Sequence, residues 1–161
     1  MLTNIAIFTP FLTFTLAGPE SIKNALAAIY QNQTNNPRAL SGTSADVGGY
    51  GCWCYIDSAH GKGKGHPVDN LDAECKTLHH NYECLIMDRD IGESTCEVDP
   101  WDVYYERDVN VFMAMFNLDE DALESACEVA NQGDQCKIDV CKVEMSFSLR
   151  VSSATLTEMS F

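Results

Sequence analysis

The residues with the clearest chemistry in this sequence are eight cysteines, all of which lie between residues 52 and 141. An even number of cysteines in a small acidic chain favours four disulfides formed in an oxidising compartment. Zinc binding is the alternative, but zinc modules usually have two cysteine pairs with wider, regular spacing. The cysteines that we expect to form disulfides are Cys52, Cys54, Cys75, Cys84, Cys96, Cys127, Cys136 and Cys141.

Charge and length limit the classes of protein that have to be considered. The chain has 161 residues, and 24 Asp and Glu residues against 10 Lys and Arg residues give a formal net charge of −14. Such a balance excludes a nucleic-acid-binding protein and opposes tight docking on anionic membranes, because both need an excess of cations. A hydrophobic content of 45% supports one domain with a sizeable core.

The first 17 residues contain no charged side chain. Thr15 and Ala17 are small enough for signal cleavage before Gly18, and the segment is too short and too rich in threonine for a membrane span. Leu12, Phe14 and Leu16 alternate with smaller residues, which is equally typical of a retained β-strand. Both alternatives place the chain outside the cytosol. The glycosylation triplet that begins at Asn32 agrees with this localisation.

The sequence predicts three separate helices and one strand–helix unit before residue 141. The first is expected over residues 20–31, and the second from Asp69 or Asn70 to about Met87, with Asp69 as a candidate N-cap. A strand followed by a helix is expected over residues 103–116. The third helix is expected over residues 117–130, where acidic residues lie near its positive end and a glycine follows it.

The last twenty residues have a different pattern. Apolar side chains occupy every second position, with polar side chains between them, which is the pattern of a β-strand with one buried face. The alternating apolar residues are Val143, Met145, Phe147, Leu149 and Val151. The register slips at Ser152, so two short strands or one bulged strand are expected in this tail.

The stretch from Tyr50 to Cys84 resembles the secreted phospholipase A2 family. It begins Tyr-Gly-Cys-Trp-Cys and, after an insertion of five residues, continues with alternating glycines and then Pro-x-Asp-x-x-Asp-x-x-Cys. The matching positions are Tyr50, Gly51, Cys52, Cys54, Gly63, Gly65, Pro67, Asp69, Asp72 and Cys75. The resemblance implies a helical core fastened by disulfides.

Two positions that carry the chemistry of that family are changed. Counted from Cys75 without a gap, the position of the catalytic histidine falls on Leu78 and that of the calcium-binding aspartate on His79. A shift of one residue would make His79 the base and place His80 at the aspartate position, but an extra helical residue rotates all later ones by about 100°. Leucine cannot accept a proton, and histidine is a poor calcium ligand. We therefore expect a disabled active site.

The resemblance also implies a calcium loop, and calcium binding can survive the loss of catalysis. The carbonyl groups of the family loop correspond to Trp53, Tyr55 and Asp57, and Asp57 could add its carboxylate. Gly61 and Gly63 lie in the inserted turn and are flexible enough to bring further carbonyls inward. These five residues form the candidate Ca²⁺ site, with a loop that binds no metal as the alternative.

A set of disulfide pairs follows from the same resemblance, since the spacing of the cysteines does not determine how they pair. Cys54 is expected to pair with Cys75. Two further pairs would join Cys84 to Cys127 and Cys52 to Cys141, which leaves Cys96 with Cys136.

Together these observations predict a mainly α, disulfide-stapled, phospholipase A2-like core over residues 18–141 with an added β-strand tail over residues 142–161. We expect a secreted protein with a structural or interaction role that associates with itself through its terminal strands into extracellular polymers. The alternatives are an active calcium-dependent phospholipase A2 with His79 as general base, and a small disulfide-rich binding module. Lipid binding is left open.

Overall fold

The computed structural model of the chain describes residues 14–17, 21–28, 50–54, 63–92 and 96–158. Most of these residues are helical. A helical segment over 21–28 follows strand β1 (Phe14–Ala17), and the later elements are α3 (Asn70–Asp90), the short 3₁₀ helix η1 (Pro100–Asp102), β2 (Tyr104–Arg107), α4 (Val109–Asn117), α5 (Glu120–Ala130) and α6 (Gln135–Glu158).

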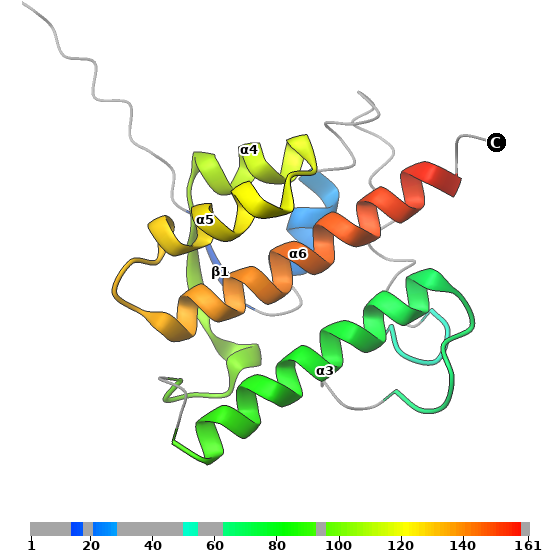
Figure 1. Ribbon diagram of the computed structural model, residues 1–161, viewed down its shortest axis with the longest axis horizontal. Helices are drawn as coiled ribbons and strands as arrows, with labels where there is room; N and C mark the ends of the chain where they lie inside the picture. The colour runs from blue at the N-terminus through cyan, green and yellow to red at the C-terminus, as the bar shows by residue number, and fades with distance from the viewer. Residues whose placement is uncertain (1–13, 18–20, 29–49, 55–62, 93–95, 159–161) are drawn as a thin grey trace, which may run out of the picture.

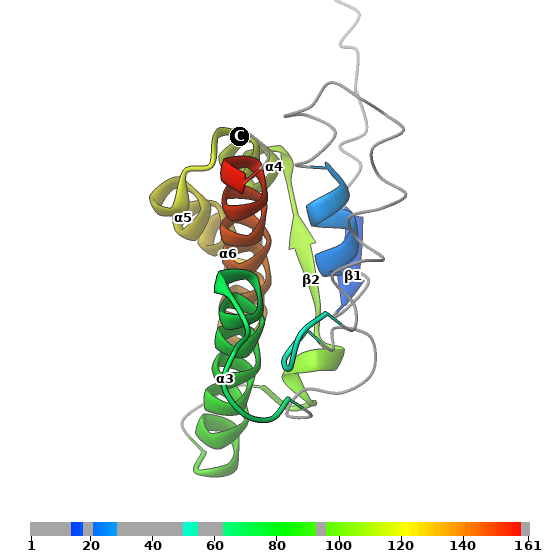
Figure 2. The same cartoon turned by 90° about the vertical axis from the view of Figure 1, so that its right-hand side faces the viewer.

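Helix α6 lies at the centre of the fold, with α3 antiparallel to it on one side and the α4–α5 hairpin on the other (Figure 1). Strands β1 and β2 and the helical segment over 21–28 form a layer against one face of these helices (Figure 2). None of the described helices is long and apolar enough to cross a membrane.

The helix starts follow from aspartate caps, as the sequence predicts for the second helix. The Asp69 carboxylate accepts from the N–H of Asp72 at 2.9 Å and begins α3. Asp108 and Asp119 cap α4 and α5 in the same way. Such a side chain satisfies N–H groups that have no partner within the first helical turn. The strand and helix expected over 103–116 are confirmed as β2 and α4.

The two strands form a small antiparallel sheet in which Phe14 pairs with Arg107 and Ala17 with Tyr104. β1 therefore agrees with the strand alternative for the N-terminal segment over these four residues. The other edge of β2 is covered by the side chain of Asn131, whose amide donates to the Glu106 carbonyl at 3.0 Å and accepts from the Glu106 N–H at 2.7 Å.

The prediction of a β-strand tail over residues 142–161 is wrong. Helix α6 passes without interruption through residue 141 and continues to Glu158. Every position over 144–149 is buried, because α3, α5, β2 and η1 all contact this helix. The serines between the apolar residues bond within the helix: Ser148 Oγ donates to the Glu144 carbonyl and Ser152 Oγ to the Ser148 carbonyl, both at 2.8 Å.

Three disulfides fasten the fold, and two of them are predicted pairs: Cys54–Cys75 and Cys96–Cys136. The predicted bonds Cys84–Cys127 and Cys52–Cys141 are wrong, because Cys127 bonds to Cys141 on the adjacent helix. Cys52 and Cys84 are left as free cysteines. The chain is therefore mainly helical with three disulfides, and not four.

Candidate functional site

The buried carboxylate of Asp72 organises the segment that the sequence analysis singled out. It accepts from the backbone N–H groups of Cys52 at 3.0 Å, Trp53 at 2.7 Å and Val68 at 3.0 Å. Burial raises the pKa of Asp72, but the hydrogen bonds from these N–H groups outweigh it and leave the pKa below its ordinary value. The first turn of α3 thereby holds the segment on which Trp53 lies.

Gly51 allows this segment to approach Asp72 closely. Its φ of +61° lies in the left-handed region, and a Cβ atom placed on it would lie 2.5 Å from the Asp72 carboxylate. No other residue fits both conditions, because an L side chain is strained at this φ and would displace the carboxylate.

His79 lies seven residues, or about two turns, further along α3 and points toward the same segment. Its Nε2 atom is 2.8 Å from the carbonyl oxygen of Trp53, and its side chain is completely buried. A carbonyl oxygen only accepts, so Nε2 must carry the hydrogen and donate it. The imidazole plane also lies nearly parallel to the Trp101 ring, with 6.4 Å between the centroids. His79 therefore joins α3 to the Trp53 segment.

The neighbouring positions have no such contact with the loop carbonyl. Leu78 is completely buried in an apolar cluster with Ile22, Tyr82 and Phe147. His80 is exposed, and its ring lies edge-on to the Trp53 ring with 5.8 Å between the centroids. Leu78, which the ungapped count places where the family has its general base, is therefore an aliphatic core residue.

The candidate calcium ligands are only partly in view, because Tyr55, Asp57 and Gly61 lie outside the described residues. The carbonyl oxygen of Trp53 accepts a hydrogen bond from the His79 N–H. At Gly63, an added Cβ would lie 2.3 Å from the Trp53 ring, so this glycine makes room for the indole. Within the described residues, no group of three or more His, Cys, Asp or Glu side chains could hold a metal ion. The calcium site therefore stays a prediction.

The Trp53 ring is held from several sides. Its Nε1 donates to the Gly65 carbonyl at 3.1 Å, and Lys76 Nζ lies over the ring, 5.0 Å from its centroid. The Cys54–Cys75 disulfide fixes the next residue of the segment to α3. These contacts make the junction between the segment and the helix a rigid structural unit.

A second polar cluster, which the sequence analysis missed, lies in the core around Glu144. This carboxylate is completely buried and accepts hydrogen bonds from the hydroxyl groups of Tyr82 and Tyr105. Ser21 Oγ in turn lies 2.5 Å from the Tyr105 hydroxyl, and Arg107 Nη1 donates to the Ser21 carbonyl at 3.3 Å. Glu144 is the one acidic residue between Val143 and Val151. Its place in this largely apolar stretch was the sequence signal that could have pointed to a buried carboxylate.

The Glu144 cluster connects α3, β2, α6 and the helical segment over 21–28. Burial raises the pKa of Glu144 to about 7, although the hydrogen bonds and the charge of Arg107 act in the opposite direction. Burial also raises the pKa of both tyrosines well above its ordinary value. Glu144 therefore binds a proton more readily than an exposed glutamate does.

The groups described here bind backbone and one another. The imidazole of His79 donates to a carbonyl, the Asp72 carboxylate receives amide hydrogens, and Glu144 is enclosed by tyrosines. This chemistry holds segments together. No protein-family model, curated protein or solved structure matches the chain.

Proposed function

We propose that this protein is a non-catalytic extracellular protein that acts by binding, on a helical scaffold fastened by disulfides. The observation that carries the proposal is the contact between His79 Nε2 and the Trp53 carbonyl oxygen, at 2.8 Å. It commits the only buried histidine among the described residues to holding the backbone.

Two further contacts support a structural role at this position. In the ungapped count His79 takes the place of a calcium-binding aspartate, and its N–H group now meets the carbonyl that a calcium ion would meet. Leu78, at the position of the general base, is packed among apolar side chains. A hydrogen bond from the imidazole thus takes over the task of an ion in fixing the segment to α3.

An extracellular localisation is proposed from the three disulfides, since such bonds persist in oxidising compartments. Pairing through terminal strands is not part of the proposal. β1 is paired with β2 of the same chain, and the C-terminal segment is helical. The C-terminal segment therefore offers no strand for such pairing.

The alternative is an active phospholipase in which His79 is the general base. It requires Nε2 to leave the Trp53 carbonyl or the other ring nitrogen to receive the proton. Mixed phospholipid–detergent micelles, assayed for fatty acid release with calcium and with EDTA, distinguish the two functions. We expect release at the level of a blank without protein in both conditions.

The variant His79→Gln tests the same point, with His80→Gln as the matched exposed control. Release that requires calcium, is lost in His79→Gln and is retained in His80→Gln would overturn the proposal. Equal, blank-level release from the wild type and both variants supports it.

A further inference from the structure

Helices α4 and α5 lie side by side as a hairpin, and a groove of about 410 Å³ runs between them. The side chains that line the groove from α4 are three or four positions apart, so they share one face of this helix. They are Asn110, Met113, Ala114 and Asn117. The groove thus follows α4 over about two turns.

The wall of the groove on α5 has the same spacing and is built mainly from small side chains. Ala122, Ser125, Ala126 and Val129 line it, and none of them carries a charge. Ala126 and Ala114 on the facing helix are buried, so they form the floor of the groove. Small residues at the floor let the side chains of another helix approach both helices closely.

Large apolar side chains are exposed along this groove. Met113 of α4 is 51% exposed and Val129 of α5 is 66% exposed, and both line it. Val109, in the first turn of α4, is also half exposed. Apolar surface of this kind gains free energy when a partner removes it from water. The groove therefore favours an occupant with an apolar face.

Several contacts hold the two helices in this arrangement. Leu118 has a φ of 54°, in the left-handed region, and ends α4. The N–H of Asp119 donates to the Ala114 carbonyl at 3.1 Å, and the Asp119 carboxylate accepts from the Ala122 N–H at 2.9 Å. The disulfide of Cys127 fixes α5 to α6. A groove held in this way needs little ordering when it binds, which favours affinity.

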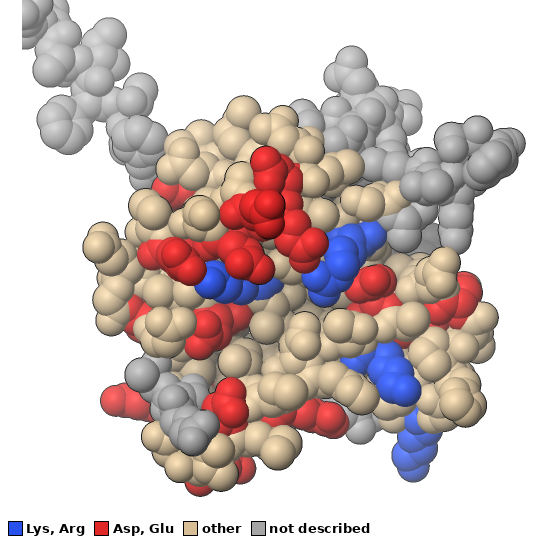
Figure 3. Space-filling view, in the orientation of Figure 1, with Lys and Arg blue, Asp and Glu red and all other residues tan. Residues whose placement is uncertain are grey.

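The hairpin is also strongly acidic. Residues 108–130 contain no Lys, Arg or His. Their carboxylates belong to Asp108, Asp119, Glu120, Asp121, Glu124 and Glu128. Those on α5 form an acidic patch beneath the uncharged surface over α4 (Figure 3). The groove therefore has an acidic ridge along one side.

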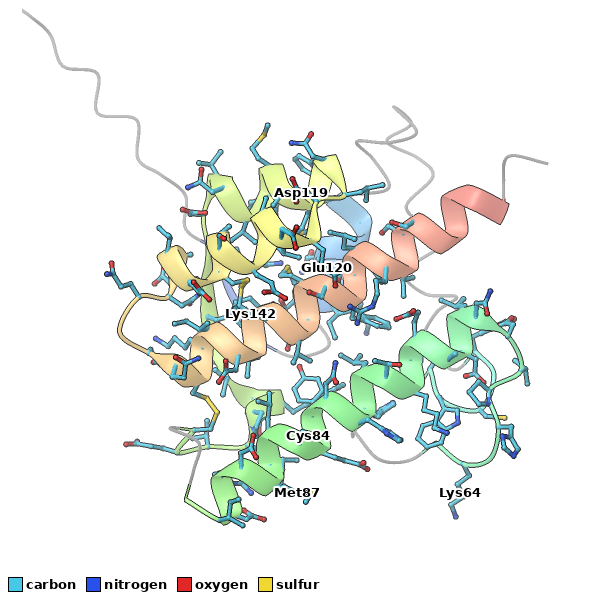
Figure 4. The ribbon with its side chains drawn as sticks, in the orientation of Figure 1. Lys64, Cys84, Met87, Asp119, Glu120 and Lys142 are labelled. Atoms are coloured by element: carbon cyan, nitrogen blue, oxygen red, sulfur yellow. A yellow bond between two sulfur atoms is a disulfide. The ribbon has the colours of Figure 1, made fainter. Side chains whose placement is uncertain are left out.

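Cations neutralise only part of this charge. Lys142 on α6 lies beside α5, and its Nζ atom is 2.7 Å from Glu128 (Figure 4). Arg150 Nη1 lies 2.8 Å from Glu120. Arg107 lies against α4 but is buried, so it offers no charge to a partner at the surface.

Two carboxylates of the ridge are free to meet a partner. Asp121 and Glu124 are exposed, and neither forms an ion pair with a described residue. They come one position before Ala122 and Ser125 of the groove wall, and one position turns a helix by about 100°. Long cationic side chains on the flank of a molecule in the groove can therefore reach them.

We propose that the α4–α5 groove binds a cationic amphipathic helix of a partner protein. The apolar side chains of this helix enter the groove beside Met113 and Val129, and its Lys or Arg side chains meet Asp121 and Glu124. A second copy of this chain is a poor occupant, because each copy has a net charge of −14, and an anionic membrane is repelled as well. This inference rests on the proposed function, in which the protein acts by binding, and it names the surface and the class of partner.

The probe is a synthetic peptide of about 14 residues, with Leu at every third or fourth position and Lys at the flanking positions. Fluorescence anisotropy of the labelled peptide measures its binding to the full chain with its three disulfides. One control peptide has Glu in place of every Lys, and the other has the same composition in a scrambled order without an apolar face. We expect the probe to bind roughly tenfold more tightly than either control.

The apolar contact is tested with Met113→Ser and Val129→Ser combined in one chain. Met87→Ser combined with Val98→Ser is the matched control, because these exposed apolar residues lie outside the hairpin. Circular dichroism verifies that both double variants keep the helical content of the wild type. We expect the hairpin variant to weaken binding roughly tenfold at both about 20 mM and about 150 mM salt, and the control to leave it unchanged.

The acidic ridge is tested with Glu124→Lys, and Glu83→Lys is the control. Both glutamates are exposed and lie within a helix, but Glu83 is on α3, on the other side of α6. We expect Glu124→Lys to weaken binding by roughly threefold or more at low salt, with a smaller effect at high salt, and Glu83→Lys to have much less effect. Equal effects of the two substitutions would contradict the assignment of the ridge.

Three other results would overturn the proposal: a probe that does not bind, a scrambled peptide that binds as tightly as the probe, or a Met113 and Val129 double variant that binds like the wild type. Any of these results in a protein that releases no fatty acid would leave the proposed function standing. Calcium-dependent hydrolysis by a protein that binds the probe would instead overturn that function alone.

Discussion

The carboxylate of Glu144 on α6 accepts a hydrogen bond of 2.7 Å from the hydroxyl of Tyr105 on β2. Its other oxygen accepts from Tyr82 on α3, so one buried acid connects three elements. A carboxylate in such a place is stabilised by its donors and opposed by its burial. Burial is the larger effect on Glu144 and raises its pKa.

The first prediction concerns how the stability of the protein depends on pH. The pKa of Glu144 is raised from 4.5 to about 7 in the folded protein. A group whose pKa is raised on folding contributes stability below its unfolded pKa and loses it as the pH rises through the folded pKa. We expect the free energy of unfolding to fall by roughly 3 kcal/mol between pH 5 and pH 8.

Urea denaturation at several pH values measures this change, and Glu144→Gln is the variant that tests its origin. The amide does not titrate, so the variant should show a nearly flat profile over the same range. The same fall in the wild type and in Glu144→Gln would show that another group is responsible.

The second prediction concerns the contact between His79 and Trp53. His79→Asp removes the donor from the Trp53 carbonyl and introduces a carboxylate, which is a ligand that calcium prefers. Without calcium we expect a loss of about 1–2 kcal/mol, because a part-buried carbonyl loses its hydrogen bond. The wild type should show no change of melting temperature on addition of calcium, whereas the variant should gain stability.

Thermal melts with millimolar calcium and with EDTA measure both effects. Magnesium is the control ion, because its octahedral geometry fits a carbonyl loop poorly. A calcium-dependent rise in the melting temperature of the wild type would contradict the role given to His79.

The third prediction separates close packing from backbone strain. Gly51→Ala places a methyl group at a positive φ and also 2.5 Å from the Asp72 carboxylate. Gly92→Ala introduces only the backbone strain of a positive φ, since the φ of Gly92 is +79° and an added Cβ would meet nothing within 4 Å. We expect a loss of about 1–2 kcal/mol at Gly92, and a larger loss at Gly51. Equal losses in chemical denaturation would mean that the Asp72 contact contributes nothing.

The fourth prediction concerns Arg150, whose Nε and Nη1 atoms reach Glu74 on α3 and Glu120 on α5. Arg150→Lys keeps the charge but cannot make both contacts with a fixed fork. These groups are partly exposed, so we expect a loss of only about 0.5–1 kcal/mol that shrinks at high salt. Arg89→Lys, which affects a pair of adjacent residues, should change the stability less. A larger effect at Arg89 would contradict the bridging role of Arg150.

The sequence was sufficient for the helices that have local signals. Asp69 shows the start of α3, and Val103 with the residues after it shows a strand that turns into a helix. These signals act within one turn of the chain, and neighbouring elements do not alter them. The pairing of Cys54 with Cys75 was implied only by the family resemblance of residues 50–84, and the structure has this pair.

The same reasoning failed for α6 because this helix is surrounded. An exposed face normally gives a helix its period of 3.6 residues, but Glu144, Ser146 and Ser148 are as buried as their apolar neighbours. The remaining signal was the alternation of branched and aromatic residues, which favours a strand. The tertiary contacts of α6 with four other elements override that preference.

The candidate site was only partly accessible for a related reason. Spacing placed Trp53 and His79 in one motif, but it could not show that the imidazole would donate to the carbonyl. That contact depends on Asp72 and Gly51, which bring the backbone against α3 from twenty residues away in the sequence. The role of Glu144 also depends on long-range contacts, with Tyr82 separated from it by 62 residues.

The amide of Asn131 has a consequence for how this molecule avoids aggregation. By satisfying both the N–H and the carbonyl of Glu106, it occupies the place that a neighbouring strand would take. At Glu106, a strand from another polypeptide therefore cannot add to this edge of β2 in the way that amyloid growth requires.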